Sequence, residues 1–377
     1  MSPHILSELT TPAAVVDLGR LRSNTEWMSK RAHQLGVKLR PHVKTHKCIE
    51  AARYQVDGHS GAIAVSTLAE AEQFANAGFH DITYAVPLAP GRAPRAAVLS
   101  QRITSLQVLV DHEASVLALS QAMATTGGDI EVLVKIDCGY GRAGLEPSDP
   151  RLIHLVQQIV EHDQLEFVGV LAHAGHAYDC SSVDEIKAIA EIERSETVRA
   201  ADRIRAHGIP VRVVSVGSTP TASHVEDLSG VTELRPGNYA LFDLFQASIG
   251  SCSTSDVALS VLSEVIGVYP ERNTVLIDAG ALALSKDPGA THVTENSGFG
   301  VICDLDLNPI HGLALVGLSQ EHGKVLIDEA FVGELPKVGD RIRILPNHSC
   351  LVTALHHLLH VVDSGSLVEE WSPVRGW

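Results

Sequence analysis

The segment RPHVKTHK, residues 40–47, contains the side chain with the clearest chemical potential, Lys44. It follows an alternating apolar segment, VKLRPHV, and precedes a helical pattern, so we expect Lys44 at the carboxyl end of a strand. A lysine amine that is poorly solvated and close to Arg40, His42 and Lys47 is favoured in its neutral, nucleophilic form. Such an amine can form a Schiff base with an aldehyde. The alternative is an ordinary solvated charge at the end of a strand.

A second candidate for chemistry is the segment GSTPT, residues 217–221. Gly217 lets the backbone approach an anion closely, and Ser218 and Thr219 supply hydroxyl groups at the start of a helix, where N–H groups are unpaired. The pattern is typical of a phosphate site, although an ordinary helix N-cap also explains it. A reactive lysine that faces a phosphate site is what pyridoxal 5'-phosphate (PLP) requires.

The third candidate is PNHSC, residues 346–350, in which His348 and Cys350 stand two residues apart. In an extended segment their side chains point to the same side. Imidazole and thiolate are zinc ligands, and a catalytic zinc leaves positions open for water and substrate. An H-x-C pair alone is weak evidence, so Zn²⁺ or another divalent cation is a hypothesis for these residues.

The elements that must position these residues alternate in type. Apolar, β-branched runs alternate with helical patterns, and the carboxyl ends of the runs carry the polar candidates. An open doubly wound sheet would show an early G-x-G-x-x-G fingerprint, which is missing. We therefore predict an α/β protein with a (β/α)8 TIM-like barrel, whose site forms at the carboxyl ends of the strands. The eight predicted strands are residues 37–43, 61–66, 81–86, 105–111, 130–137, 166–173, 211–217 and 231–239.

The pattern changes near residue 256 to strands with few helical stretches, which predicts a second, β-rich domain. The early strand PAAVVDL is expected to join it. We predict a PLP-binding barrel domain over residues 20–247, and a β-rich domain with the metal site over residues 1–19 and 248–377. HHLLH, residues 356–360, is expected to be a solvated helical face.

Composition narrows the class of function. The chain has 377 residues and a formal net charge of -16, with 45 acidic and 29 basic residues, which argues against a nucleic-acid partner. No stretch approaches the roughly 18 apolar residues of a membrane span, and the N-terminal residues lack a signal-peptide pattern. Six cysteines are scattered without C-x-x-C pairs, so free thiols are expected. These features indicate a cytoplasmic protein that acts on small molecules, with no membrane partner.

Six segments in order, RPHVKTHK, GYGRAG, HAGHAY, VSVGSTPT, RPGNYALFD and PNHSC, resemble the D-serine dehydratase and D-threonine aldolase group of the alanine-racemase-like (fold type III) PLP enzymes. The resemblance covers nearly the whole chain. It implies that Lys44 binds PLP covalently and removes the Cα proton of the substrate, and that Arg142 approaches the ring oxygen of the cofactor. The further implied cofactor residues are His42, His173, Tyr178, Gly217, Ser218, Thr219, Gly237, Asn238 and Tyr239, and the implied metal ligands are His348 and Cys350.

The resemblance implies a PLP- and zinc-dependent dehydratase that converts a D-3-hydroxy amino acid, such as D-serine, D-threonine or D-threo-3-hydroxyaspartate, to a 2-oxo acid and ammonia. Cys350 stands where the aldolases tend to have Asp, which favours a dehydratase. The alternative is a metal-dependent D-threonine or 3-hydroxy-D-aspartate aldolase that releases glycine and an aldehyde. A racemase would have no use for zinc, and non-catalytic PLP carriers are usually the barrel alone. Relatives of this fold often dimerise, so we expect a monomer or a homodimer.

Overall fold

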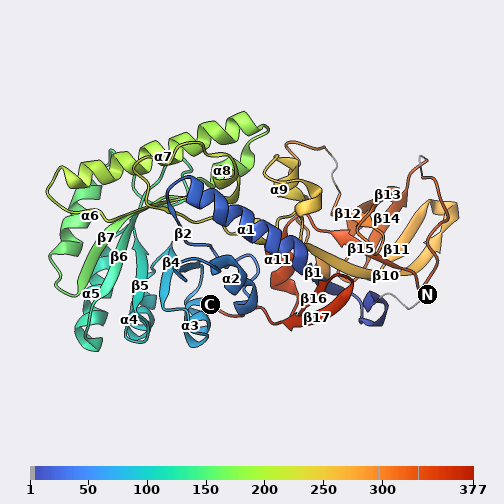
Figure 1. Ribbon diagram of the computed structural model, residues 1–377, viewed down its shortest axis with the longest axis horizontal. Coiled ribbons are helices and arrows are strands. Elements are labelled where there is room, and N and C mark those ends of the chain that lie inside the picture. Colours follow the sequence, from blue (N-terminus) through green and yellow to red (C-terminus); the bar gives the residue numbers. More distant parts are fainter. Residues whose placement is uncertain (1–4, 296–297, 330) are drawn as a thin grey trace. The chain divides into compact units, whose positions relative to one another are not determined.

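The chain forms two compact units in the computed structural model, which describes residues 5–295, 298–329 and 331–377 (Figure 1). Unit 1 comprises Met1–Glu26 and Asn238–Pro373, and unit 2 comprises Trp27–Gly237 and Val374–Trp377. Helix α1 (Leu18–Gln34) begins in unit 1 and ends in unit 2.

Unit 2 is built on a sheet of eight parallel strands in the order β2-β9-β8-β7-β6-β5-β4-β3. The two end strands also meet, because Val43 N donates to Ala64 O and Ala64 N donates to Pro41 O, both at 2.9 Å. These bonds close the sheet and confirm the predicted (β/α)8 barrel. The strands are β2 (Lys38–Leu39), β3 (Ile63–Val65), β4 (Asp81–Pro87), β5 (Ser105–Val110), β6 (Ile130–Lys135), β7 (Leu165–Leu171), β8 (Val213–Val216) and β9 (Glu233–Leu234).

Helices follow the strands and pack around the outside of this sheet (Figure 1). Their apolar faces cover strands that are buried on both sides, which is why the strands read as nearly continuous apolar runs. Within the described ranges, no helix is both long and apolar enough to cross a membrane. The helices are α2 (Ile49–Val56), α3 (Leu68–Asn76), α4 (Ala93–Ser100), α5 (Glu113–Thr126), α6 (Arg151–Val160), α7 (Val183–Arg205) and α8 (Thr219–His224).

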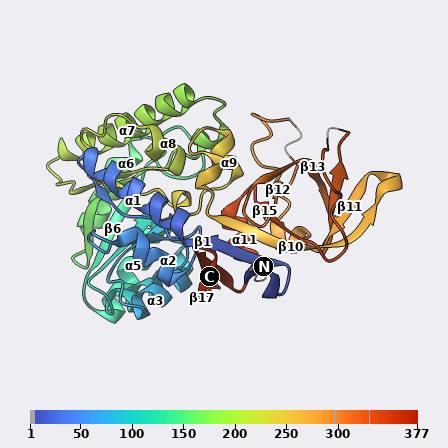
Figure 2. The same cartoon turned by 45° about the vertical axis from the view of Figure 1, so that its right-hand side comes forward.

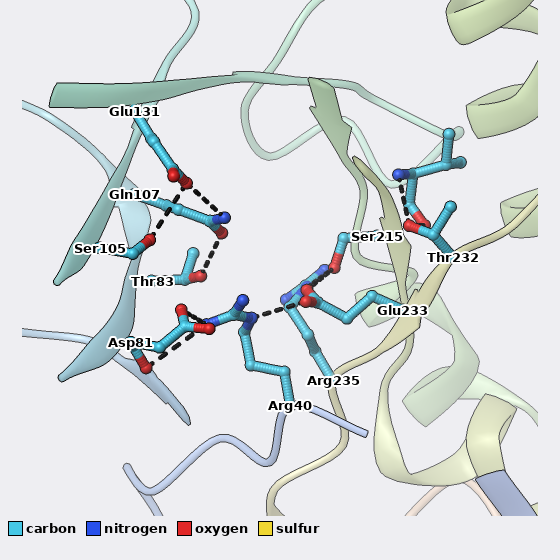
Figure 3. Close-up of polar contacts among 11 residues, drawn as sticks. Arg40, Asp81, Thr83, Ser105, Gln107, Glu131, Ser215, Thr232, Glu233 and Arg235 are labelled. Carbon is cyan, nitrogen blue, oxygen red and sulfur yellow. Dashed lines mark hydrogen bonds and ion pairs between the residues drawn. The ribbon is translucent and has the colours of Figure 1, made fainter. Parts of the chain in front are cut away.

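The barrel also holds buried charges in paired contacts (Figure 3). Arg40 Nε donates to Glu233 Oε2 and Arg40 Nη1 donates to Asp81 Oδ1, each at 2.6 Å. The side chains of Arg40 and Glu233 are 7% and 5% exposed. Ser215 Oγ donates to Glu233 Oε1 and accepts from Arg235 Nε, both at 2.6 Å. These contacts join residues of β4, β8 and β9 and residues that follow β2 and β9, and they satisfy charges that would be costly to bury alone.

Unit 1 contains a nine-stranded sheet in the order β11-β14-β13-β12-β15-β10-β1-β16-β17. Its described pairings are antiparallel apart from the parallel pair of β1 and β16. The long strand β10 pairs with β1, β11 and β15 and runs through the sheet (Figure 2). The strands are β1 (Ala13–Asp17), β10 (Leu259–Tyr269), β11 (Thr274–Ile277), β12 (Val301–Cys303), β13 (Pro309–Leu318), β14 (Gly323–Ile327), β15 (Arg341–Leu345), β16 (Leu359–Asp363) and β17 (Ser366–Trp371).

Three short helices complete the regular structure described here for unit 1, α9 (Leu244–Ser248), α10 (Ala281–Leu284) and α11 (Ser349–Leu355). The expectation for HHLLH was wrong. His356 lies at the end of α11, and Leu359 is fully buried as the first residue of β16. The spacing of the histidines is typical of a polar helical face. Residues 359–363 nevertheless form β16, because they pair with β1 and β17.

We predict that replacing Arg40 with methionine lowers the free energy of unfolding of unit 2 by about 3–5 kcal/mol, because Glu233 would stay buried without its cation. Urea denaturation of the native and variant chains measures the difference. The control is Lys187→Met, which removes an exposed ion pair with Glu226 and should cost far less stability, because water screens that pair. A loss for Arg40→Met as small as that of the control would contradict the prediction.

Candidate active site

Lys44 lies in the turn after β2, and the buried ring of His42 contacts its backbone. His42 Nδ1 accepts from Lys44 N at 3.3 Å, and His42 Nε2 lies 3.3 Å from Ser66 Oγ. Because Nδ1 accepts, the ring proton belongs on Nε2, which donates to Ser66. Burial, followed by the charge of Lys44, holds the His42 pKa well below its usual value. The imidazole beside Lys44 is therefore neutral.

His173 follows β7, and its Nδ1 lies 3.4 Å from Gly217 O. Burial holds the His173 pKa well below its usual value, and the charges of Lys44, Lys135 and Arg142 lower it further. One neutral imidazole thus lies within electrostatic range of cations from three different segments of unit 2.

Two of the cations at this end of the barrel are deeply buried. Lys135, the last residue of β6, is 5% exposed, and burial lowers its pKa to about 8. Burial also lowers the pKa of Arg235 to about 10. With Lys44 and Arg142, they form a group of four cations near His173. We call this group the cationic cluster, and its charge favours an anionic ligand although the chain as a whole is acidic.

The ring of Tyr140 contacts both nearby imidazole rings, those of His173 and His176. It stacks on His176 with centroids 5.9 Å apart, meets His173 edge-on at 6.4 Å, and lies 5.1 Å from the guanidinium carbon of Arg142. A Cβ atom at residue 175 would lie 2.2 Å from the Tyr140 ring, so Gly175 is needed for this approach. Tyr178 is half-buried in the short helix η3 (Gly175–Asp179).

The GSTPT segment forms the turn from β8 into α8. Ser218 caps the helix, since Thr221 N donates to its Oγ at 3.3 Å, and Ser218 N donates to Thr221 Oγ1 at 2.9 Å. Glu193 of α7, only 2% exposed, accepts from Gly217 N at 3.0 Å, Thr221 Oγ1 at 2.9 Å and Ala174 N at 2.8 Å. One buried carboxylate thus fixes both this loop and the segment that follows His173.

Gly237 packs directly against His42, two residues before Lys44. A Cβ atom at this position would lie 2.6 Å from the carbonyl oxygen of His42. A Cβ atom at Gly217, which has a φ of 117°, would lie 2.9 Å from Leu234 and 3.0 Å from Arg235 N. Close backbone approach, rather than flexibility, requires both glycines.

The predicted metal ligands lie in unit 1, at the start of α11. His348 Nδ1 is 2.7 Å from Asp287 Oδ2. Burial alone would lower the His348 pKa, but hydrogen bonds to Asp287 and Cys350 outweigh it and raise the pKa to about 11. The structure thus brings His348 and Cys350 into contact. Within the described parts of the chain, no group of three or more His, Cys, Asp or Glu side chains could hold a metal, so a site here would rest on two protein ligands.

Within unit 1, Asp243 accepts hydrogen bonds both from Asn238 and from Ser349, which lies between the predicted metal ligands. Its Oδ2 accepts from Asn238 Nδ2 at 2.8 Å and from Ser349 N at 3.0 Å, and Asp243 is 1% exposed. Asn238 Nδ2 also lies 3.8 Å from Cys350 Sγ. Tyr239, the next residue, is fully buried. A proposed cofactor residue and a proposed metal ligand therefore lie side by side.

The residues present fit both implied groups. Four cations beside neutral imidazoles suit a phosphate-bearing aldehyde. The buried carboxylates Glu233 and Glu193 both act on Arg235, and Glu193 also acts on Lys135. An imidazole and a thiol in contact are a donor pair that zinc prefers.

Comparison with known proteins supports this interpretation. The family model "Alanine racemase, N-terminal domain" matches residues 16–244, and a serine dehydratase domain model matches residues 258–362. D-threo-3-hydroxyaspartate dehydratase of Delftia sp. is 40% identical, covering 99% of both chains. D-serine dehydratase of Dictyostelium discoideum is 36% identical, covering 99% of this chain and 98% of the relative.

Solved structures agree with the sequence relatives. An alanine-racemase-like protein from Idiomarina loihiensis superimposes with a TM-score of 0.95 at 38% identity, with 100% of both chains covered. A variant of D-threo-3-hydroxyaspartate dehydratase, solved in a metal-free form, superimposes with a TM-score of 0.94 at 40% identity, with 99% of this chain and 100% of that chain covered. D-threonine aldolase of Arthrobacter sp. is more distant, at 29% identity, with 97% of this chain and 92% of that protein covered.

Fold and comparisons together define a PLP-dependent lyase with an alanine-racemase-like barrel. More narrowly, the chain belongs to the family of the D-serine and D-threo-3-hydroxyaspartate dehydratases. The predicted family is therefore confirmed.

Sequence reasoning missed several residues that the structure places at these sites. Lys135 ends the strand that precedes the GYGRAG segment, and Tyr140 lies within that segment, so their positions could have identified them. Arg235 is the first residue of the segment RPGNYALFD and follows a strand in the same way. Glu193 and Asp287 offer no such signal, because each reaches its partners only through the folding of a distant element.

We predict that Gly237→Ala weakens PLP binding by about 5- to 150-fold, since the added methyl group must displace His42 at a cost of about 1–3 kcal/mol. Titration of the apo-protein with PLP, followed by the visible absorption of the cofactor, measures the affinity. Gly91→Ala is the matched control, because a Cβ atom there meets nothing within 4 Å. Equal affinities for the two variants would contradict the assignment of Gly237.

Proposed function

We propose that this chain eliminates water from a D-3-hydroxy amino acid and releases a 2-oxo acid and ammonia. PLP would be bound at Lys44 and a divalent cation, zinc first among the candidates, at His348 and Cys350. D-threo-3-hydroxyaspartate is the substrate that we favour, followed by D-serine, because proteins with those names are 40% and 36% identical over nearly the whole chain. The observation that carries the proposal is the cationic cluster around Lys44 in a chain so similar to these dehydratases.

Lys44 has the central role in the proposal. Its Nζ would hold the cofactor aldehyde and, once the substrate amine has displaced it, would take the proton from Cα. Bound PLP supplies the electron sink that makes this proton acidic. His42 and His173 support the role because both rings are neutral and lie close to Lys44, and neither competes with it as a cation.

Further residues would hold the cofactor. Arg142 would approach its ring oxygen, and His173 and Tyr178 would line the ring. The N–H groups of Gly217 and Ser218 already donate to Glu193 and Thr221, so the loop would meet a phosphate as a preformed turn. The residues proposed for the phosphate are Gly217, Ser218, Thr219, Gly237, Asn238 and Tyr239.

His348 and Cys350 would hold the metal, which supplies a Lewis acid for a poor leaving group, the β-hydroxyl. The metal-free form described for a variant of D-threo-3-hydroxyaspartate dehydratase supports a metal in this family. The contact of Asn238 with Cys350 further supports a metal close to the cofactor residues of unit 1.

Replacement of Lys44 by alanine should lower turnover of D-threo-3-hydroxyaspartate by at least about 100-fold, because both the covalent anchor and the general base are lost. Release of 2-oxo acid from the purified protein measures the effect. Lys38→Ala serves as the control, since that lysine is exposed on β2, the strand that precedes the turn with Lys44. Full turnover by the Lys44 variant would rule out the scheme.

Chelation of the metal should abolish formation of 2-oxo acid and ammonia, and added zinc should restore it, while the visible absorption of PLP persists. The assay compares D-threo-3-hydroxyaspartate, D-serine and D-threonine. Glycine and an aldehyde among the products would establish the aldolase alternative instead. Activity that survives metal removal would overturn the role of His348 and Cys350.

A further inference from the structure

Asp287 makes one contact that the proposed reaction does not yet explain. It lies beyond α10 in the chain, 61 residues before His348, and its Oδ2 is 2.7 Å from His348 Nδ1. The two side chains are 21% and 35% exposed. A carboxylate that faces Nδ1 of a histidine determines which ring nitrogen carries the proton.

Asp287 is itself held from several sides. Its Oδ1 accepts from Gly289 N at 2.8 Å, and its backbone N donates to Ser285 Oγ at 3.3 Å. Its carbonyl oxygen accepts from Asn347 Nδ2 at 3.0 Å. Asn347, which is 4% exposed, directly precedes His348 and also donates to the carbonyl oxygen of Gly298 at 2.9 Å. The loop around Asp287 and the start of α11 are thus joined by both side chain and backbone.

We propose that Asp287 is the positioning residue of the metal site, and this inference rests on the proposed function. Its carboxylate accepts a hydrogen bond from Nδ1–H of His348, so the nitrogen left to lose its proton and bind the metal beside Cys350 is Nε2. The hydrogen bond also fixes the plane of the ring and increases the basicity of Nε2. A site with only two protein ligands depends strongly on such support, because no third His, Cys, Asp or Glu ligand is found among the residues that the structure describes.

Zinc affinity of the full-length protein tests the proposal without reference to activity. The metal-stripped chain, loaded with PLP, is titrated with Zn²⁺ against a chromophoric chelator. Asp287→Ala is expected to weaken zinc binding by about 10- to 100-fold. Asp287→Asn keeps an acceptor for Nδ1–H, so it should retain much of the affinity that the alanine variant loses.

Asp304→Ala is the matched control, because Asp304 also accepts from backbone N–H groups in a turn of unit 1 but has no such contact with His348. It should bind zinc as the native chain does. Native zinc affinity in Asp287→Ala, together with loss of binding in His348→Ala, would overturn the role of Asp287 and leave the proposed function intact. A native chain that binds no zinc would overturn the metal site, and Asp287 with it.

Discussion

The buried ion pair between Arg40 and Glu233 is the constraint on which the catalytic end of unit 2 depends. Both side chains are almost completely buried, so each needs its charged partner inside the barrel. The pair connects β9 with the residue that follows β2, and through Ser215 it also positions Arg235 (Figure 3). Lys44 follows Arg40 by four residues, and Gly237 follows Glu233 by four. The charges that hold the barrel together therefore also fix the starting points of the segments that carry the chemistry.

The cationic cluster concentrates positive charge in unit 2, although the net charge of the protein is negative. Glu193 acts on Lys135 and Arg235, and Glu233 also acts on Arg235, yet burial still lowers the pKa of both cations. Keeping such groups together costs stability, and binding of a phosphate-bearing ligand would recover part of that free energy. Burial, and then the charges of these cations, lowers the pKa of His42 and His173, so neither imidazole carries a charge beside Lys44.

The sequence alone predicted the barrel strands well, because a parallel strand buried on both faces reads as a short apolar run wherever it occurs. It also identified Lys44 and GSTPT as strand-end segments, since polar residues after such runs are easy to recognise. It failed at HHLLH, where tertiary pairing overrides a local pattern, and it could not find Glu193 or Asp287. Glu193 accepts a hydrogen bond from Gly217, and Asp287 contacts His348, and each partner lies more than 20 positions away in the chain. Contacts between residues so far apart leave no repeating pattern in the sequence.

The most direct test of the account is the location of the cofactor bond. Borohydride reduction of the PLP-loaded protein, followed by proteolysis and mass spectrometry, identifies the lysine that carries the pyridoxyl group. We predict that it is Lys44. Labelling of Lys135, the buried lysine whose pKa is lowered to about 8, or of no lysine at all, would contradict the account.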